Sequence, residues 1–542
     1  MQVVYDSASM EFDENGLKDF FWPLTRKEQE VSRDALLSEL VSVARSRNDA
    51  TDAERDLVSA MLQLLAREGL VLLLTYAVGR RTYAEGHEPV WPAGCNHCEH
   101  VGKGIAPPVE TSALIRVLKK GPVCHPSWRR YPVRLRRDLR CNGFGIGAIR
   151  LANPQKDIYS CHTTDVLEEH ARSLDETVKY TLMGEWFSAV DEQSEETLKT
   201  PALIDGIVDE VIQALSNAFE SIGEELPESF EAYFRNVVVR GSRIINVHLN
   251  RVLARPHEIP KRLWTGTGGY IWARLLRHVV RRQGGEVTGH EHGTGESIIR
   301  YFNTKTFSDL ESADSFVTFN SNHRDWLIET VDERFLVPAT KPEIRIPEYS
   351  KELVRYAGRP LRGDKTQHQA DNVKKKLMYV GPIYVGFSPR VSNHNSDILL
   401  IDWQSRLFKK LTEWGYEVLF KPHPEGEQRP PAVFNQMPGV TELYEPFEDV
   451  WSQADVYLFD WKSTTAYSTA MSTGLPVVMV DFSFEIFVPE MQALVEKNCA
   501  LVKGWADDKN RLQTDWSQLK AAIDNPPSGN GSELREKVFK FA

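Results

Sequence analysis

Apolar residues recur along this chain with two different periods. Between residues 163 and 235 they return every three or four positions, as in IDGIVDEVIQALSNAFESIG, which predicts helices. From about residue 260 onward, short apolar runs alternate with helical segments of this kind. Such an alternation predicts β-α-β units and therefore parallel, doubly wound sheets.

The first alternating unit is expected over residues 241–337. A strand ends in the turn TGTGG, the helix YIWARLLRHVVRRQGG follows, and EVTGHEHG forms the next strand and turn. Residues 338–376 are polar, contain four prolines and show no sustained period, which predicts a linker.

A second unit follows over residues 377–542. The strands KLMYVGPIYVG, YEVLFKPHP, DVYLFD and PVVMVDF alternate with helices such as SDILLIDWQSRLFKKLTEWG and STTAYSTAMSTG. Two Rossmann-like units joined by a linker form a cleft, and the carboxyl ends of both sheets are expected to face it. The predicted fold class is α/β.

The chain ahead of these units is less regular. Residues 1–160 read as a mixed region in which DAERDLVSAMLQLLAREG is a helix and LVLLLTYAVG a buried strand. Residues 161–240 form an acidic helical segment. We expect both parts to extend the amino-terminal side of the molecule.

Composition limits what the protein can do. With 542 residues and 41% hydrophobic composition it should hold two or three domains. Its net charge of −11 provides no general field for nucleic acid. The stretch 116–140, in contrast, holds nine Lys/Arg and one Asp. It could contact an anionic membrane or a lipid-linked acidic acceptor, or it could pair with the acidic helices that follow.

No signal peptide is visible at the start of the chain. The most apolar region is interrupted by Arg67 and Glu68, so we do not expect it to span a membrane. We expect a soluble cytoplasmic protein, with peripheral membrane contact as the alternative. Ordinary thiols are favoured over a zinc site, because only one cysteine pair has ligand spacing; the four candidates are Cys95, Cys98, Cys124 and Cys141.

Polar residues follow two strands of the second unit. His423 and Pro424 come directly after one strand, and DWKSTTAYSTA places Ser463, Thr464 and Thr465 at the start of a helix. An imidazole at a strand end and the N–H groups of a helix start suit a phosphate. Alternatively, Ser463 is only a helix cap and His423 an ordinary turn residue.

The run from KPHP through EDVWSQADVYLFDWKSTTAYSTAMSTGLPVVMVDF resembles the carboxyl half of bacterial cell-surface polymer transferases with the GT-B fold. CDP-glycerol glycerophosphotransferases, and transferases that use CMP-sialic acid or CMP-Kdo, carry such a His-Pro motif and hydroxyl pair. The resemblance implies a GT-B-like fold and a carboxyl-terminal donor domain. It also implies that His423, Pro424, Ser463 and Thr464 hold the cytidine phosphate.

The stretch GHEHGTGE belongs to the amino-terminal, acceptor-side unit. In the families that the chain resembles, a His-Gly turn here faces the acceptor, and His292 with Gly293 matches it. Glycosyl transfer needs a base for the acceptor hydroxyl, so His292 is our first candidate and Glu291 the second. His290 could point with His292 or satisfy backbone groups.

Other strand-end residues are candidates for sugar contacts. Gly266, Thr267 and Gly268 could line the donor sugar or acceptor, or form a plain tight turn. Arg390 and Ser392, after the first strand of the second unit, could hold the carboxylate of an acidic sugar. No Asp-x-Asp pair stands at a strand end, so we expect a reaction without metal or cofactor, in which the nucleotide sugar is a substrate.

The leading hypothesis is a glycosyltransferase that moves a sugar, such as Kdo, from a CMP-sugar to a bacterial surface glycan. A CDP-glycerol or ribitol phosphotransferase would use the same phosphate cradle. An epimerase of the UDP-GlcNAc kind would keep the fold without an acceptor. A non-enzymatic adaptor in polysaccharide assembly would not need His292, His423 and Ser463 together.

Overall fold

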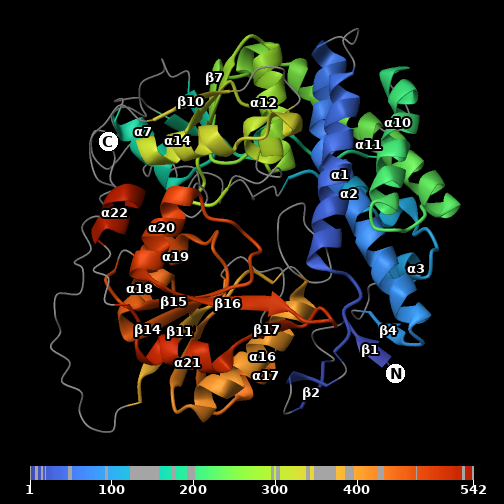
Figure 1. Ribbon diagram of the computed structural model, residues 1–542. Helices are drawn as coiled ribbons and strands as arrows, with labels where there is room; N and C mark the ends of the chain where they lie inside the picture. The colour runs from blue at the N-terminus through green and yellow to red at the C-terminus, as the bar shows by residue number, and fades with distance from the viewer. Residues whose placement is uncertain are drawn as a thin grey trace.

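A computed structural model shows two α/β units flanked by a bundle of long helices (Figure 1). It describes the chain except positions 1, 14–15, 19 and 472 and the ranges 6–9, 47–51, 92–95, 123–157, 174–177, 192–201, 294–297, 301–305, 337–341, 347–373, 385–395, 424–431, 528–531 and 540–542.

The first unit is built on a six-stranded parallel sheet in the order β10-β9-β8-β7-β5-β6. The strands are β5 (Ile158–His162), β6 (Val178–Tyr180), β7 (Arg262–Thr265), β8 (Glu286–His290), β9 (Ser315–Val317) and β10 (Glu343–Arg345). Its helices include α7 (Asp165–Ser173), α12 (Ile271–Arg282) and α14 (Ser321–Thr330). The sheet thus takes β5 from the boundary between the mixed region 1–160 and the segment 161–240, β6 from the segment expected to be helical, and β10 from the expected linker.

The second unit holds a seven-stranded sheet in the order β13-β12-β11-β14-β15-β16-β17. Its strands are β11 (Lys376–Val380), β12 (Glu417–Lys421), β13 (Val440–Glu442), β14 (Val456–Phe459), β15 (Val477–Asp481), β16 (Ala500–Ala506) and β17 (Leu512–Thr514). All neighbours pair in parallel except β16 and β17. Helices α16 (Asp397–Glu413), α19 (Thr465–Met471), α20 (Pro489–Asn498) and α21 (Trp516–Asp524) connect and cover it.

Two Rossmann-like units confirm the predicted α/β, GT-B-like fold. Their buried strands read as continuous apolar runs, such as VYLF in β14 and VVMV in β15. Parallel sheets covered on both faces require such runs, because neither face of the strand meets water.

The helical bundle contains α1 (Arg26–Arg45), α2 (Asp52–Ala84), α10 (Ala202–Glu220) and α11 (Glu228–Leu253). The prediction of a strand at LVLLLTYAVG is wrong, because α2 runs through it without interruption. Buried neighbours surround this part of α2, so its apolar residues lose the one-sided pattern of a surface helix. Val58–Ala84 is long and apolar enough to cross a membrane, yet 72% of its most apolar window is buried inside the protein.

Segments from the two ends of the chain tie the units together. The backbone N–H of Leu17 donates to Asp402 of α16 (3.0 Å), so the amino-terminal residues contact the second unit. Helix α22 (Ser532–Phe539) returns to the first unit, where Asn320 Nδ2 donates to the Lys537 carbonyl (3.1 Å). Each unit is therefore held by a segment that is remote from it in sequence.

Candidate active site

The turn that follows β8 reaches the second unit. The backbone N–H of Glu291 still donates to the Val317 carbonyl of β9 (2.9 Å), and the chain then turns. His292 is exposed at this turn, and Gly293 is buried. A β-carbon at Gly293 would lie 2.6 Å from Oγ1 of Thr465, the first residue of α19. The His-Gly turn of one unit therefore packs against the Ser/Thr segment of the other.

His423 lies on the same edge of the second sheet as this Ser/Thr segment. It is half-buried two residues beyond β12, and Ser463 to Thr465 are half-buried beyond β14. Only β11 separates these strands, so two strand spacings place the segments roughly 10 Å apart across the sheet. The carboxyl edge of a parallel sheet is where ligands of such folds bind.

The backbone at Ser463 already holds an anion from the protein itself. The carboxylate of Glu485 accepts hydrogen bonds from the N–H groups of Lys462 (3.0 Å) and Ser463 (2.7 Å). Burial raises the pKa of Glu485, and its hydrogen bonds to Ser463 and Lys462 oppose that rise. The Ser463 N–H group is therefore already engaged by a carboxylate of the protein.

His290 and Glu291 point into the first unit. His290 Nε2 lies 2.9 Å from His170 Nδ1 of α7, and burial lowers the pKa of His290 well below its usual value. The fully buried carboxylate of Glu291 accepts from the Phe319 N–H (2.9 Å) and lies 3.2 Å from His323 Nδ1. Neither side chain is placed to contact an acceptor, because β8 ends at His290 and the turn redirects only His292 outward.

A second histidine that the sequence reasoning missed lies beside His292. His162 ends β5, and its ring centroid is 5.6 Å from that of His292. Its signal was available, because IYSCHTTD has the same form as EVTGHEHG: a short strand that ends in histidine. The residue was overlooked because β5 lies outside the predicted first unit.

The TGTGG turn is shaped by contacts within the protein. A β-carbon at Gly266 would lie 2.2 Å from Thr164 Cγ2 and 2.8 Å from His162 Nδ1. A β-carbon at Gly268 would lie 2.1 Å from the Ser308 carbonyl oxygen, and the Gly268 N–H donates to Asp309 (2.9 Å). These glycines are explained by close packing, which favours the tight-turn interpretation.

Thr267 and Asp460 also stand at strand ends. Thr267 is half-buried, and its hydroxyl donates to Asp309 (3.3 Å). Asp460, after β14, is buried and accepts from the Tyr379 hydroxyl (2.7 Å) and Trp403 Nε1 (2.9 Å). Burial raises the pKa of Asp460 to about 6. Asp460 therefore serves an internal hydrogen-bond network.

Several predicted residues fall outside the described part of the chain, namely Pro424, Arg390, Ser392, Cys95, Cys124 and Cys141. Cys98 takes part in a disulfide, so it offers no thiolate to zinc in this structure. Among the described residues no three His, Cys, Asp or Glu side chains gather as metal ligands.

Comparison with known proteins gives only distant likenesses. No family model and no curated protein matches the chain. Similar solved structures include the glycotransferase of kitacinnamycin (11% identity over 71% of this chain and 95% of that one, TM-score 0.33). A glycosyltransferase from Streptomyces sp. SF2575 is also similar, with 11% identity over 70% of this chain and 94% of that one and a TM-score of 0.29. The UDP-GlcNAc 2-epimerase from Methanocaldococcus jannaschii has 12% identity over 70% of this chain and 98% of that one, with a TM-score of 0.31. Values this low carry no argument about activity.

Proposed function

We propose that the protein is a GT-B-type glycosyltransferase that moves a sugar from a cytidine nucleotide donor to a bacterial surface glycan. The observation that supports this most is the contact between the His292–Gly293 turn and Thr465. It brings the turn that carries the exposed His292 against the Thr465 hydroxyl of the other unit. Glycosyl transfer needs both a base and a phosphate cradle at one place.

In this proposal the two units have separate tasks. His423, Thr464 and Thr465 hold the donor phosphate through an imidazole and two hydroxyl groups. His292 accepts the proton of the acceptor hydroxyl, because imidazole suits proton transfer near neutral pH. The acceptor oxygen then bonds to the anomeric carbon, the bond from that carbon to the phosphate oxygen breaks, and CMP leaves.

His162 extends the acceptor side of the proposed site. Its ring lies next to His292, so it can orient that imidazole or contact the acceptor. An acidic donor sugar such as Kdo remains our candidate through the resemblance at KPHP. A CDP-glycerol or ribitol donor would use the same cradle, and only turnover of the donor distinguishes the two.

The test is nucleotide binding by calorimetry on the full chain. We expect CMP to bind and His423→Ala to weaken that binding at least tenfold. His257→Ala is the matched control, because His257 is an exposed histidine of the first unit away from the strand ends. Equal CMP affinity in the wild type and His423→Ala, or no CMP binding at all, would contradict the proposal.

A further inference from the structure

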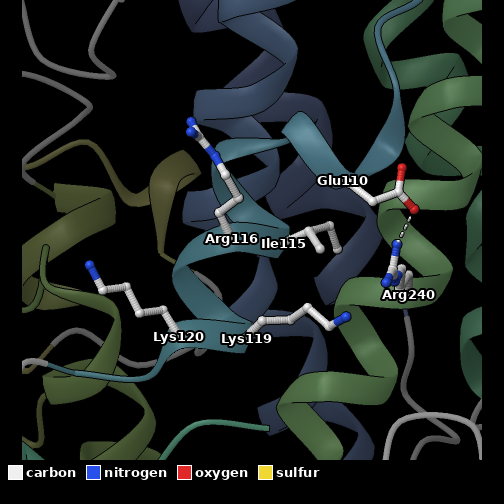
Figure 2. Close-up of a pocket in the computed structure, with 6 residues that line it drawn as sticks. All are labelled: Glu110, Ile115, Arg116, Lys119, Lys120 and Arg240. Atoms are coloured by element: carbon white, nitrogen blue, oxygen red, sulfur yellow. Dashed lines mark hydrogen bonds and ion pairs between the residues drawn. The ribbon is translucent and has the colours of Figure 1, made fainter. Parts of the chain in front are cut away.

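A pocket of about 470 Å³ lies on the helical bundle, apart from the strand-end site. It is formed by the 3-10 turn η1 (Val109–Thr111), α4 (Ala113–Lys120) and α11. Figure 2 shows its lining, which consists of Glu110, Ile115, Arg116, Lys119, Lys120 and Arg240.

The pocket is strongly cationic although the chain as a whole carries a net charge of −11. Four of the six lining residues are cations, and Glu110 is the single carboxylate. Arg240 Nη1 lies 2.9 Å from Glu110 Oε1, which offsets one positive charge and leaves a formal charge of +3. Arg116 and Lys120 are exposed, so their cationic ends are accessible.

Helix α4 provides a rigid platform for these cations. The Ser112 hydroxyl caps its start by accepting from the Ile115 N–H (3.3 Å), and His248 Nε2 donates to the Leu118 carbonyl (2.9 Å). The Lys119 carbonyl accepts from the Val190 N–H (2.9 Å), in the segment that follows β6. A platform held at both ends lowers the entropy cost of binding a ligand.

The helix dipole of α4 accounts for only some of the four cations that line the pocket. Lys119 and Lys120 occupy the last turn of α4, where cations stabilise the helix dipole. Arg240 belongs to α11 and faces α4 from the other side, as Figure 2 shows. Figure 2 shows Lys119 extending toward the side of Arg240, while Arg116 and Lys120 extend from the opposite side of α4, so cations of two helices border the pocket.

We infer that this pocket binds the phosphate ester of a sugar-sized molecule. A dianionic phosphate matches a charge of +3 better than a single carboxylate does. The ammonium group of Lys119, which extends toward the side of Arg240 in Figure 2, suits phosphate oxygens. The side chain of Ile115 lies between Arg116 and Glu110 at the floor of the pocket and is almost fully buried, so the apolar surface for the carbon body comes mainly from the aliphatic stems of the lysines and arginines. The volume falls within the range of small-molecule sites. The inference is independent of the reaction in the cleft.

The test uses glucose 6-phosphate as the probe, with unphosphorylated glucose alongside, on the full chain saturated with CMP so that the strand-end site is occupied. We expect glucose 6-phosphate to bind, glucose not to bind, and Lys119→Glu to weaken binding at least fivefold. Arg116→Glu should do the same if Lys119→Glu disturbs α4. The control Lys261→Glu changes the charge equally at an exposed lysine on the amino-terminal side of β7, and its affinity should equal that of the wild type.

Three outcomes would overturn the inference. The first is the absence of glucose 6-phosphate binding in the wild type. The second is an equal loss in Lys119→Glu and Lys261→Glu, which would indicate only general charge attraction. The third is binding to phosphatidylglycerol vesicles without binding to glucose 6-phosphate, which would indicate a membrane surface instead of a pocket.

Discussion

Gly293 approaches Thr465 so closely that a β-carbon at Gly293 would lie 2.6 Å from the threonine hydroxyl oxygen. The two residues belong to different units and are remote in sequence. The contact brings the turn that carries His292 to the start of α19. The same loop pairs with the second unit again at Ile299 and Phe487. The spacing of the two units at the proposed site is therefore fixed by direct packing.

Replacing Gly293 by alanine should disturb this spacing. The added methyl group must displace Thr465, whose branched side chain has few alternative rotamers. We expect donor turnover to fall at least tenfold, while the free energy of unfolding falls by about 1–2 kcal/mol. Donor hydrolysis assays and thermal melting measure the two effects.

Two further variants separate this clash from a general effect of alanine. At Gly269 the nearest atom to an added β-carbon is 3.4 Å away, which is an ordinary contact. Gly269→Ala should therefore keep wild-type activity. The double variant Gly293→Ala/Thr465→Ala removes the clashing oxygen and should recover stability. A double variant that is no more stable than Gly293→Ala would show that the two residues are not coupled.

His292→Asn should separate catalysis from donor binding. Asparagine keeps a polar side chain at the turn but cannot accept a proton near neutral pH, so turnover should fall by about 100-fold or more. The affinity for CMP should stay within about twofold, because the phosphate contacts belong to the second unit. Calorimetry and turnover on the same preparation measure both. A loss of CMP affinity as large as the loss of turnover would place His292 in the donor site instead.

The polar residues at strand ends can be predicted from the sequence, because the pattern that marks them spans only a few neighbouring residues. A short apolar run followed by histidine, as at EVTGHEHG, places its polar residues at a sheet edge once the fold is known. The same rule would have found His162 in IYSCHTTD. It failed there because this short strand, at the end of the region expected to be mixed, was not assigned to the first α/β unit.

Contacts that depend on tertiary structure could not be predicted in this way. Glu485 accepts from the Lys462 and Ser463 N–H groups although it lies 23 and 22 residues, respectively, farther along the chain. Nothing in the spacing of EIFVPE shows that its glutamate turns back to that segment. Likewise the strand assigned to LVLLLTYAVG is helical, because burial on all sides removes the periodicity on which the assignment depends.

Glu291→Gln distinguishes a positioning role from a direct catalytic role for this residue. The buried carboxylate accepts from the Phe319 N–H group and contacts His323. In glutamine an NH₂ group takes the place of one of these oxygens, and it cannot accept a hydrogen bond. We expect the free energy of unfolding to fall by about 1–3 kcal/mol. Turnover should fall only modestly in the protein that remains folded. The measurements are denaturant unfolding and turnover at a temperature well below the melting point.

Glu225→Gln is the control, because Glu225 is also a glutamate of the amino-terminal half and lies outside both proposed sites. Its unfolding free energy should stay within about 0.5 kcal/mol of the wild type. If Glu291→Gln abolished turnover without any loss of stability, the carboxylate would act in catalysis directly.

Buried histidines in the helical bundle and in the first unit should make the stability of the protein depend on pH. Burial lowers the pKa of His248 and of His170 to about 4, from an ordinary value of 6.5. Between these pH values the unfolded chain binds a proton that the folded histidine does not bind. The free energy of unfolding therefore falls as the pH decreases from 6.5 to 4. Each histidine contributes a fall on the order of 1 kcal/mol for each pH unit.

His248→Gln isolates one of these contributions. Glutamine can still donate to the Leu118 carbonyl, as His248 does (2.9 Å), but it does not titrate. Relative to the wild type, the variant should gain stability steadily as the pH falls from 6.5 toward 4, and the difference should be constant above pH 7. Burial raises the pKa of Asp460 to about 6, so this residue makes the protein less stable as the pH rises from about 4 to 6. Asp460 is present in both proteins, so its contribution cancels in the difference between their free energies of unfolding.

Asn250→Gln is the control, because it is an exposed neutral change on the same helix α11. Its difference in stability from the wild type should not depend on pH. A constant difference between His248→Gln and the wild type across this range would mean that His248 is protonated in the folded protein, which its burial opposes.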